Sequence, residues 1–202
     1  AADYFKKAAD QGYIDAIIAY AICLKRGSGV KTDKKEAYQL MKTAIEKGSI
    51  DAMVILAIWY STCRPRDYMS AFKLLQDANE KGHPDASAYI GFLVEKKKIP
   101  LISNKQNMLK YYNQSCLLGS YEGMYHMATF YHYGLENLVE KNETEAFRLY
   151  NLVVKNQNYN HNKEAAIFSL SVLKEEIGDF EAAFKIADYY REKGMFVGYV
   201  RC

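Results

Sequence analysis

One twelve-residue pattern recurs along the whole chain, and this repetition constrains the fold more than any other feature of the sequence. The copies begin at Ala1, Ala37, Ala71, Met108, Ala146 and Ala183. Their last residues lie at positions 12, 48, 82, 119, 157 and 194, which are 36, 34, 37, 38 and 37 residues apart. A period of this length, kept without a gap, is typical of a solenoid built from two-helix units.

Each copy carries apolar or small residues at helical spacing. If its first residue is counted as 0, these residues stand at 0, +3, +4 and +7, which lie on one face of a helix with 3.6 residues per turn. In the third copy they are Ala71, Leu74, Leu75 and Ala78. We call this segment helix A and expect the apolar face to lie in the core.

The ends of helix A are marked by local signals. The spacing of a capping box occurs in three pairs, Asp33 with Glu36, Ser103 with Gln106, and Asn142 with Glu145. In such a pair the first side chain accepts a hydrogen bond from a free backbone N–H at the start of the helix. Glycine at +11 predicts the left-handed backbone that closes a helix. Gln157 replaces it in one copy, and the polar residues around it predict a short insertion.

A second periodic segment, which we call helix B, follows each copy. Its first and sixth residues are small, which would allow a neighbouring backbone to approach closely. The first residues are Ala16, Ala52, Ala86, Gly123 and Ala166, and the sixth are Ala21, Ala57, Gly91, Ala128 and Ser171. Each unit is therefore a helical hairpin that must stack on its neighbours to bury its apolar face.

These patterns predict an all-α fold, a right-handed α-solenoid of stacked antiparallel two-helix repeats, with about five to six units of which the terminal ones are incomplete. We expect residues 1–202 to form a single repeat domain. Because residue 1 already lies inside a predicted helix, we expect the chain to be a fragment of a longer protein. No apolar run approaches the length of a membrane span, so we expect no membrane insertion in this segment.

The charge and the cysteines bear on partners and compartment. A net charge of +3 is mild and does not predict a nucleic-acid partner. The four cysteines do not recur at the same position of the repeat; they are Cys23, Cys63, Cys116 and Cys202. This argues against one disulfide per unit and favours a reducing, cytoplasmic location, with Cys23 and Cys116 as small buried apolar residues. The glycosylation sequons at Asn113 and Asn142 keep the secretory pathway, including the ER lumen, as an alternative.

The first unit combines alanines, aromatic residues, glycines and acidic residues at fixed spacing. They are Tyr4, Ala8, Ala9, Gly12, Asp15, Ala16, Tyr20, Ala21, Gly27, Gly29, Val30 and Asp33. This pattern resembles the Sel-one-like repeat, a relative of the tetratricopeptide repeat. Part of it recurs at Asp51-Ala52 and at Asp85-Ala86. Members of that family are typically adaptors that assemble protein complexes, so the resemblance implies a binding scaffold and not a reaction.

No catalytic or metal-binding motif is found in the sequence. It contains no glycine-rich phosphate loop, no His-Glu-x-x-His, no Cys-x-x-Cys and no Gly-x-Ser-x-Gly. His126 and His132 are six residues apart and do not share a helix face. We therefore predict that the chain is not an enzyme and has no catalytic residue, no metal site and no cofactor.

Two other functions remain open at this stage. A repeat-protein hydrolase of the bacterial cysteine-rich β-lactamase-like type is suggested by resemblance alone. Single-stranded nucleic-acid binding would use lysines together with some of the 18 tyrosines as stacking platforms. Tyr111 and Tyr112, however, occupy core phases of helix A, which favours packing over base stacking.

The face of helix A opposite its core is the predicted binding surface. In tetratricopeptide-like arrays helix A lines the concave side, so positions +2 and +5 would line a groove. The predicted partner-binding residues are Gln39, Lys42, Lys73, Gln76, Lys110, Asn113, Arg148, Asn151, Lys185 and Asp188. From the third copy onward position +2 is always basic, which would attract an acidic or extended peptide. The alternative is an ordinary solvated face that binds nothing.

Overall fold

A computed structural model of the chain describes residues 1–156 and 162–192. Within these residues the chain forms eleven α-helices and one short 3-10 helix, which confirms the all-α prediction. The chain divides into two compact units, Ala1–Ala86 and Ser87–Cys202. In each unit the helices pack chiefly on their neighbours in sequence, as expected for a solenoid of helix pairs.

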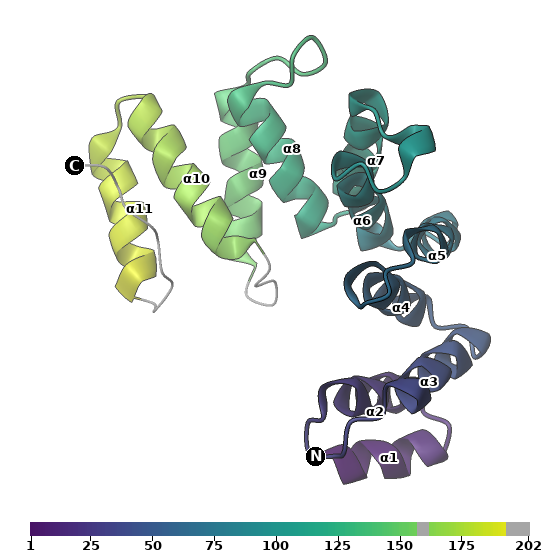
Figure 1. The fold of residues 1–202 in the computed structure, drawn as a ribbon. Coiled ribbons are helices and arrows are strands. Elements are labelled where there is room, and N and C mark those ends of the chain that lie inside the picture. Colours follow the sequence, from purple (N-terminus) through teal and green to yellow (C-terminus); the bar gives the residue numbers. More distant parts are fainter. Residues whose placement is uncertain (157–161, 193–202) are drawn as a thin grey trace. The chain divides into compact units, whose positions relative to one another are not determined.

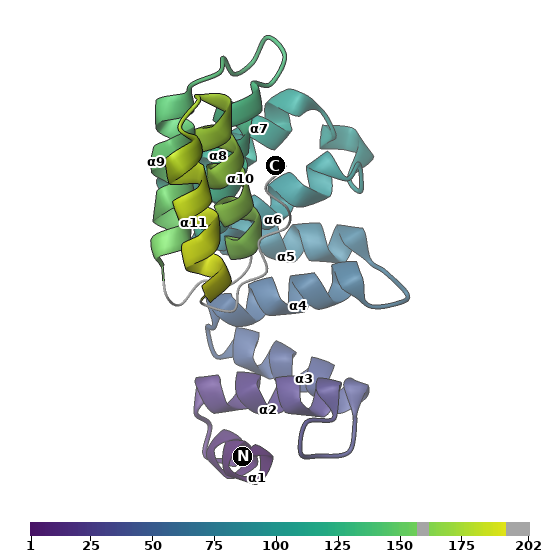
Figure 2. The same cartoon turned by 90° about the vertical axis from the view of Figure 1, so that its left-hand side faces the viewer.

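The first unit contains the helices formed by the first three copies of the pattern and by the helix B segments that follow them. They are α1 (Ala2–Asp10), α2 (Ile14–Arg26), α3 (Lys34–Glu46), α4 (Ile50–Thr62) and α5 (Tyr68–Glu80), with α6 (Pro84–Glu95) beginning at the end of this unit. Each helix from α1 to α4 packs on the next one (Figures 1 and 2). Odd-numbered helices are the predicted helix A, and even-numbered helices are helix B.

The second unit continues the same alternation. It contains most of α6, the 3-10 helix η1 (Pro100–Ile102), α7 (Lys105–Leu117), α8 (Tyr121–Tyr133), α9 (Glu143–Lys155), α10 (Lys163–Glu176) and α11 (Phe180–Glu192). From α7 onward each helix packs on its successor, and α8 also touches α10. The loop between α8 and α9 is closed by an isolated bridge between Leu135 and Val139. Among the described residues no helix is long and apolar enough to cross a membrane.

The predicted core face of helix A is buried. In α3, Ala37, Met41 and Ala44 are inaccessible to solvent, and the equivalent positions of α5, α7 and α9 are also buried. Position +3 lies at the edge of this face, so Leu40 and Leu74 are only half-buried. The pattern in the sequence therefore located the core correctly, because a helix that packs on one side must place its apolar residues every three to four positions.

The first copy departs from this rule. Tyr4 and Phe5, at +3 and +4, are 77% and 38% exposed. The cause is that, within the part of the chain that the structure describes, α1 packs mainly on α2. Tyr4 therefore matches the repeat pattern in sequence without filling the core position that the pattern predicts.

Two of the three predicted N-caps are confirmed. The side chains of Asp33 and Asn142 accept hydrogen bonds from the third following backbone N–H at 2.9 and 3.0 Å. The third prediction, Ser103, is wrong by one residue, because Asn104 caps α7. The hydroxyl of Ser103 instead donates to the carbonyl oxygen of Ile99 at 2.6 Å, across the 3-10 turn.

The closing glycines adopt the predicted left-handed backbone. Gly12, Gly48, Gly82 and Gly119 have φ angles of 89, 95, 81 and 87 degrees. Such values are strained for residues with a side chain, which explains why glycine recurs at this point of the repeat. The predicted insertion around Gln157 and the last closing glycine, Gly194, lie outside the described residues.

The small residues of helix B permit close approach between helices. A Cβ atom placed on Gly123 of α8 would lie 2.5 Å from the backbone nitrogen of Cys116 on α7. A Cβ atom on Gly91 would lie 3.1 Å from the ring of Tyr112. Packing between α7 and α8 therefore requires glycine at 123, whereas a side chain at 91 would need only a small shift of the Tyr112 ring.

Candidate functional site

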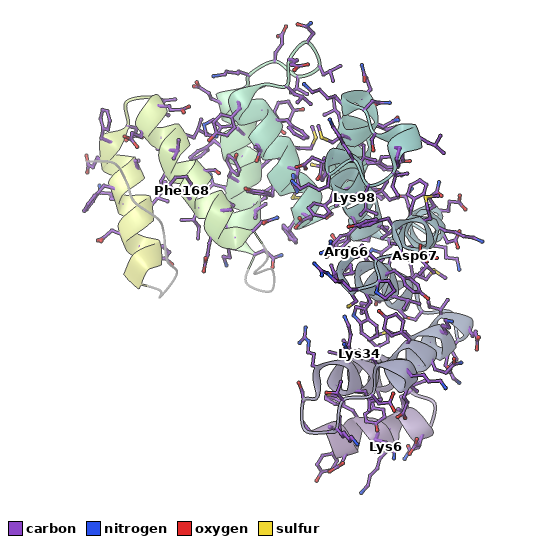
Figure 3. All side chains as sticks on the ribbon, viewed as in Figure 1. Lys6, Lys34, Arg66, Asp67, Lys98 and Phe168 are labelled. Atoms are coloured by element: carbon purple, nitrogen blue, oxygen red, sulfur yellow. The ribbon has the colours of Figure 1, made fainter. Side chains whose placement is uncertain are left out.

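The ten predicted binding residues lie on α3, α5, α7, α9 and α11. Eight are exposed, whereas Asn151 and Asp188 are half-buried. Lys6, which holds position +5 of the first copy, is likewise exposed on α1 (Figure 3). These helices therefore present the +2 and +5 positions away from the residues that form the core.

The basic residues of this face are of two kinds. Lys42, Lys73 and Lys110 make no hydrogen bond or ion pair with any part of the chain that the structure describes. Arg148, by contrast, donates two hydrogen bonds to the carboxylate of Glu145, at 2.9 and 2.6 Å. Lys185 pairs in the same way with Glu181, one turn earlier on α11.

The pairing of Arg148 changes its electrostatics. Its hydrogen bonds to Glu145 raise the pKa of the guanidinium and lower the pKa of that carboxyl. An exposed pair of this kind contributes only about 0.3–0.5 kcal/mol to stability, but it neutralises the positive charge locally. The uniform basic series of the sequence is therefore not a uniform series of free cations.

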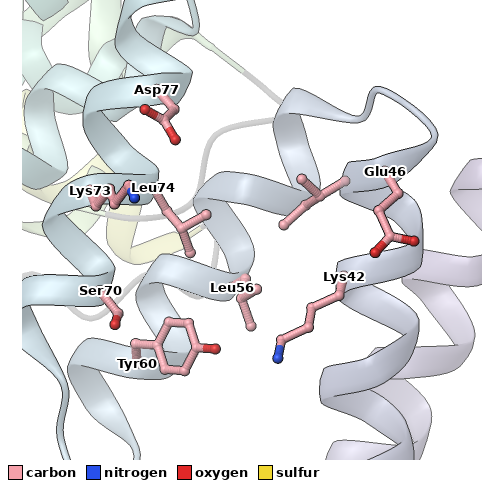
Figure 4. A pocket seen from close by; sticks show the side chains of 9 residues that line it. Lys42, Glu46, Leu56, Tyr60, Ser70, Lys73, Leu74 and Asp77 are labelled. Carbon is pink, nitrogen blue, oxygen red and sulfur yellow. The ribbon is translucent and has the colours of Figure 1, made fainter.

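A pocket of about 380 Å³ opens between α3, α4 and α5 in the first unit (Figure 4). We call it the α3–α5 pocket. Its apolar lining comes from Ile45, Leu56, Tyr60 and Leu74, and its polar lining from Lys42, Glu46, Ser70, Lys73 and Asp77. Of these nine residues only Lys42 and Lys73 belong to the predicted binding set. Leu56 carried a core signal in the sequence, and nothing there indicated that it also lines a pocket.

A second pocket, of about 400 Å³, lies in the second unit between α7, α8 and the loop before α9. Its lining residues are Leu109, Asn113, Met127, Tyr131, Leu138, Val139, Glu140, Lys141 and Asn142. Asn113 is the member that the sequence predicted. The loop is held in place where the backbone N–H of Asn142 donates to the carbonyl oxygen of Tyr131 at 2.8 Å.

Tyr112 and Tyr150, at position +4 of helix A, serve packing, whereas Tyr111, which the sequence also placed in a core phase, is only half-buried. Tyr112 is fully buried and stacks on His126, with ring centroids 4.0 Å apart. Burial, followed by the charge of Glu95, raises the pKa of Tyr112 well above its usual range. Tyr150 is also fully buried, and burial raises its pKa to about 12. Neither ring is available to stack on a base.

The two histidines of α8 have separate surroundings. His126 lies 3.5 Å from Glu122, whereas the buried His132 points Nε2 at the carboxylate of Glu176, 3.1 Å away. The described residues contain no group of His, Cys, Asp and Glu side chains that could hold a metal ion. Nδ1 of His132 has no hydrogen-bond partner among them.

The cysteines differ from the prediction in their burial. Cys23 and Cys116 were expected to be buried, but both are half-buried free thiols. Burial raises the pKa of Cys116. Cys202 lies outside the described residues.

Cys63, at the end of α4, is half-buried beside side chains from two other helices. Burial of Cys63 opposes ionisation of its thiol. Hydrogen bonds with Lys25, Thr62 and Tyr38 and the positive charge of Lys25 have the opposite effect and lower the pKa of the thiol. The Lys25 ammonium also lies 4.3 Å from the centre of the Trp59 ring. The thiol of Cys63 therefore ionises more readily than an ordinary cysteine, and no pattern in the sequence indicated this.

Comparison with known proteins identifies the repeat. The sequence matches the Sel1 repeat over residues 1–13, 14–49, 50–83 and 122–152, together more than half of the chain. The stretch between the last two segments contains α6 and α7. These two helices contact each other through the hydrogen bond from Tyr112 to Glu95, although the sequence match is absent there.

Solved structures show the same fold at low sequence identity. A Sel1 repeat protein from Oxalobacter formigenes is 22% identical with a TM-score of 0.78, covering 95% of this chain and 78% of that one. The protective antigen c5321 of uropathogenic Escherichia coli is 22% identical with a TM-score of 0.70, covering 94% and 41%. The immunity protein PA5088 of Pseudomonas aeruginosa is 18% identical with a TM-score of 0.62, covering 93% and 72%.

Proposed function

This chain belongs to the Sel1 repeat family, and on that premise we propose that it is a non-catalytic scaffold that binds a segment of a partner protein on the exposed faces of its odd-numbered helices. The observation that carries the proposal is the contrast between the two faces of these helices. The apolar faces of α3 and α5 pack against α4. Lys42 and Lys73 on the opposite faces are exposed and have no partner within the described residues.

A charge that the fold does not pair is available to a ligand. Exposed ion pairs contribute little to stability, so unpaired lysines on one helix face are tolerated without being required for folding. They can nevertheless steer and hold a partner that carries carboxylates, because complementary charge raises the rate of association and fixes the register of binding. Lys110 offers the same unpaired charge on α7 in the second unit.

A protein partner is supported by the structural neighbours. One of them is named an immunity protein, a name that implies a protein partner. The nucleic-acid alternative loses support because Tyr112 and Tyr150 are inside the core. The hydrolase alternative rests on resemblance alone, and the structure adds no observation in its favour.

The test is a charge reversal on the proposed face. Affinity capture with the wild-type chain would first identify a partner, and its dissociation constant would then be measured at several salt concentrations. We expect the triple variant Lys73→Glu, Lys110→Glu and Arg148→Glu to weaken binding by about tenfold and to reduce its salt dependence. Far-ultraviolet circular dichroism would show that the helices are retained.

A matched variant controls for the change in net charge. Lys31, Lys81 and Lys97 are exposed lysines that lie outside the helices, and replacing all three by glutamate changes the net charge by the same amount. We expect this control to bind like the wild type. If the first triple variant retained the affinity and salt response of the wild type, the basic residues would be an ordinary solvated surface and the proposed binding face would be wrong.

A further inference from the structure

The α3–α5 pocket carries four charged side chains that the fold leaves unpaired. Lys42 and Glu46 lie one turn apart on α3, and Lys73 and Asp77 lie one turn apart on α5. None of the four makes a side-chain hydrogen bond or an ion pair with any described residue. All four are thus available to something outside the chain.

Helix geometry explains why these neighbours do not pair with each other. On both helices the lysine precedes the acidic residue by four positions. That order is the weaker one, because an acidic residue that precedes a lysine by four positions pairs better and also suits the helix dipole. The sequence of each helix therefore keeps the charges close without encouraging an internal ion pair.

Each helix carries its two pocket charges in the same order. Four residues at 1.5 Å per residue separate each lysine from its acidic neighbour by about 6 Å along the helix. Figure 4 shows both carboxylates above the lysine of their own helix. On each helix the lysine is thus the cationic end of the pair and the carboxylate the anionic end, and Leu56 and Tyr60 of α4 also line the pocket.

We propose that the α3–α5 pocket binds an extended segment of a partner protein in which one apolar residue is flanked by an acidic and a basic residue. In an extended chain, residues two positions apart point to the same side and are separated by about 6.6 Å. This spacing matches the rise between the lysine and the carboxylate on each helix. The residue between them points to the opposite side, toward the apolar lining around Leu56 and Tyr60.

This inference rests on the proposed function and specifies the partner chemistry at one site. A uniformly acidic segment would pair with Lys42 and Lys73 but would be repelled by Glu46 and Asp77. A uniformly basic segment would pair with Glu46 and Asp77 but would be repelled by Lys42 and Lys73. Only a segment of mixed charge satisfies both ends, and like-charge contacts are what suppress the wrong partners at such a surface.

The test uses short synthetic peptides and the full chain. The probe is Gly-Ser-Glu-Leu-Lys-Ser-Gly, and the matched peptides replace its central triplet by Glu-Leu-Glu, Lys-Leu-Lys or Glu-Gly-Lys. Binding is followed by amide chemical shifts of the isotope-labelled protein. We expect the probe to shift the amides of Lys42, Leu56 and Tyr60, and each matched peptide to bind at least about fivefold more weakly.

A variant of the protein tests the anionic end separately. Glu46→Gln combined with Asp77→Asn removes two exposed or half-buried charges without changing side-chain size. We expect this variant to lose the preference for Glu-Leu-Lys over Glu-Leu-Glu. The inference is overturned if the probe leaves the pocket amides unshifted, if Glu-Leu-Glu binds the wild type equally well, or if the variant keeps the preference.

The outcome can be separated from that of the scaffold proposal. The peptide comparison is made on the wild-type chain, so it does not depend on any variant folding. If the natural partner responds to charge reversal on the odd-numbered helices while the peptides show no preference, the scaffold role stands and the chemistry assigned to this pocket is wrong. If the peptides discriminate but the natural partner ignores the reversal, the pocket assignment stands and the wider binding face is wrong.

Discussion

The hydroxyl of Tyr112 on α7 donates a hydrogen bond of 2.9 Å to Oε2 of Glu95, the last residue of α6. The ring of Tyr112 is fully buried, so this bond holds a carboxylate at the edge of the core of the second unit. Burial opposes ionisation of Glu95, but hydrogen bonds from Lys96 and Tyr112 outweigh it and lower the pKa of the carboxyl below its usual 4.5.

Tyr112→Phe should therefore destabilise the protein in a pH-dependent way. The substitution keeps the ring and removes one hydrogen bond to a charged group, which costs about 1.5 kcal/mol near neutral pH. A carboxyl whose pKa is lowered by folding stabilises the fold above its unfolded pKa, and this contribution disappears as the pH falls through the folded pKa. Urea unfolding would be measured at neutral pH and at pH values below 4.5. The difference in the free energy of unfolding between wild type and variant should be smaller in acid. A gap of constant size would contradict this account.

Gly123→Ala should force α7 and α8 apart. The new Cβ atom would lie 2.5 Å from the backbone nitrogen of Cys116 and 2.8 Å from the backbone carbon of Ser115. Backbone atoms cannot rotate away, so we expect a loss of about 3 kcal/mol, at the upper end of overpacking costs. Gly91→Ala is the comparison, since it meets the ring of Tyr112 at 3.1 Å and a small ring shift can relieve it. Thermal unfolding should rank Gly123→Ala as the more damaging change.

Leu75→Asp should abolish cooperative unfolding of the first unit. Leu75 is 2% exposed, so the substitution removes a buried side chain and places a carboxylate in the core. The expected cost is about 4 kcal/mol or more, and in a repeat protein it spreads because neighbouring helices lose their packing surface. Lys73→Glu, two residues earlier on the same helix but exposed, should change the unfolding midpoint very little. A Leu75→Asp protein that melted like the wild type would show that the core face is assigned wrongly.

Cys63 should react with iodoacetamide faster than Cys116. The thiolate is the nucleophile, and the pKa of Cys63 is lowered whereas that of Cys116 is raised by burial. Mass spectrometry of the alkylated protein near neutral pH would give the two rates. Lys25→Met should slow the reaction at Cys63, because Lys25 supplies the positive charge that offsets the burial of the thiol, and should leave Cys116 unchanged. Equal rates in the wild type would contradict the assignment.

The sequence by itself determined the features that depend on local geometry. Helical periodicity identified the buried residues of α3, α5 and α9, since one face of each helix must meet its neighbour. The recurrence of glycine at +11 predicted where α3, α5 and α7 end, because few other residues accept positive φ at low cost. Asp33 and Asn142 were recognised as caps because a cap involves only the next three residues.

Only the tertiary structure decided which side chains from different helices meet. The α3–α5 pocket joins Leu56 and Tyr60 of α4 to charges on two other helices, and no spacing within one helix predicts such a neighbour. The exposure of Tyr4 follows because α1 packs strongly only on α2 among the residues that the structure describes. Packing between helices is a property of the assembled core, so a periodic pattern can say which face is buried but not what lies against it.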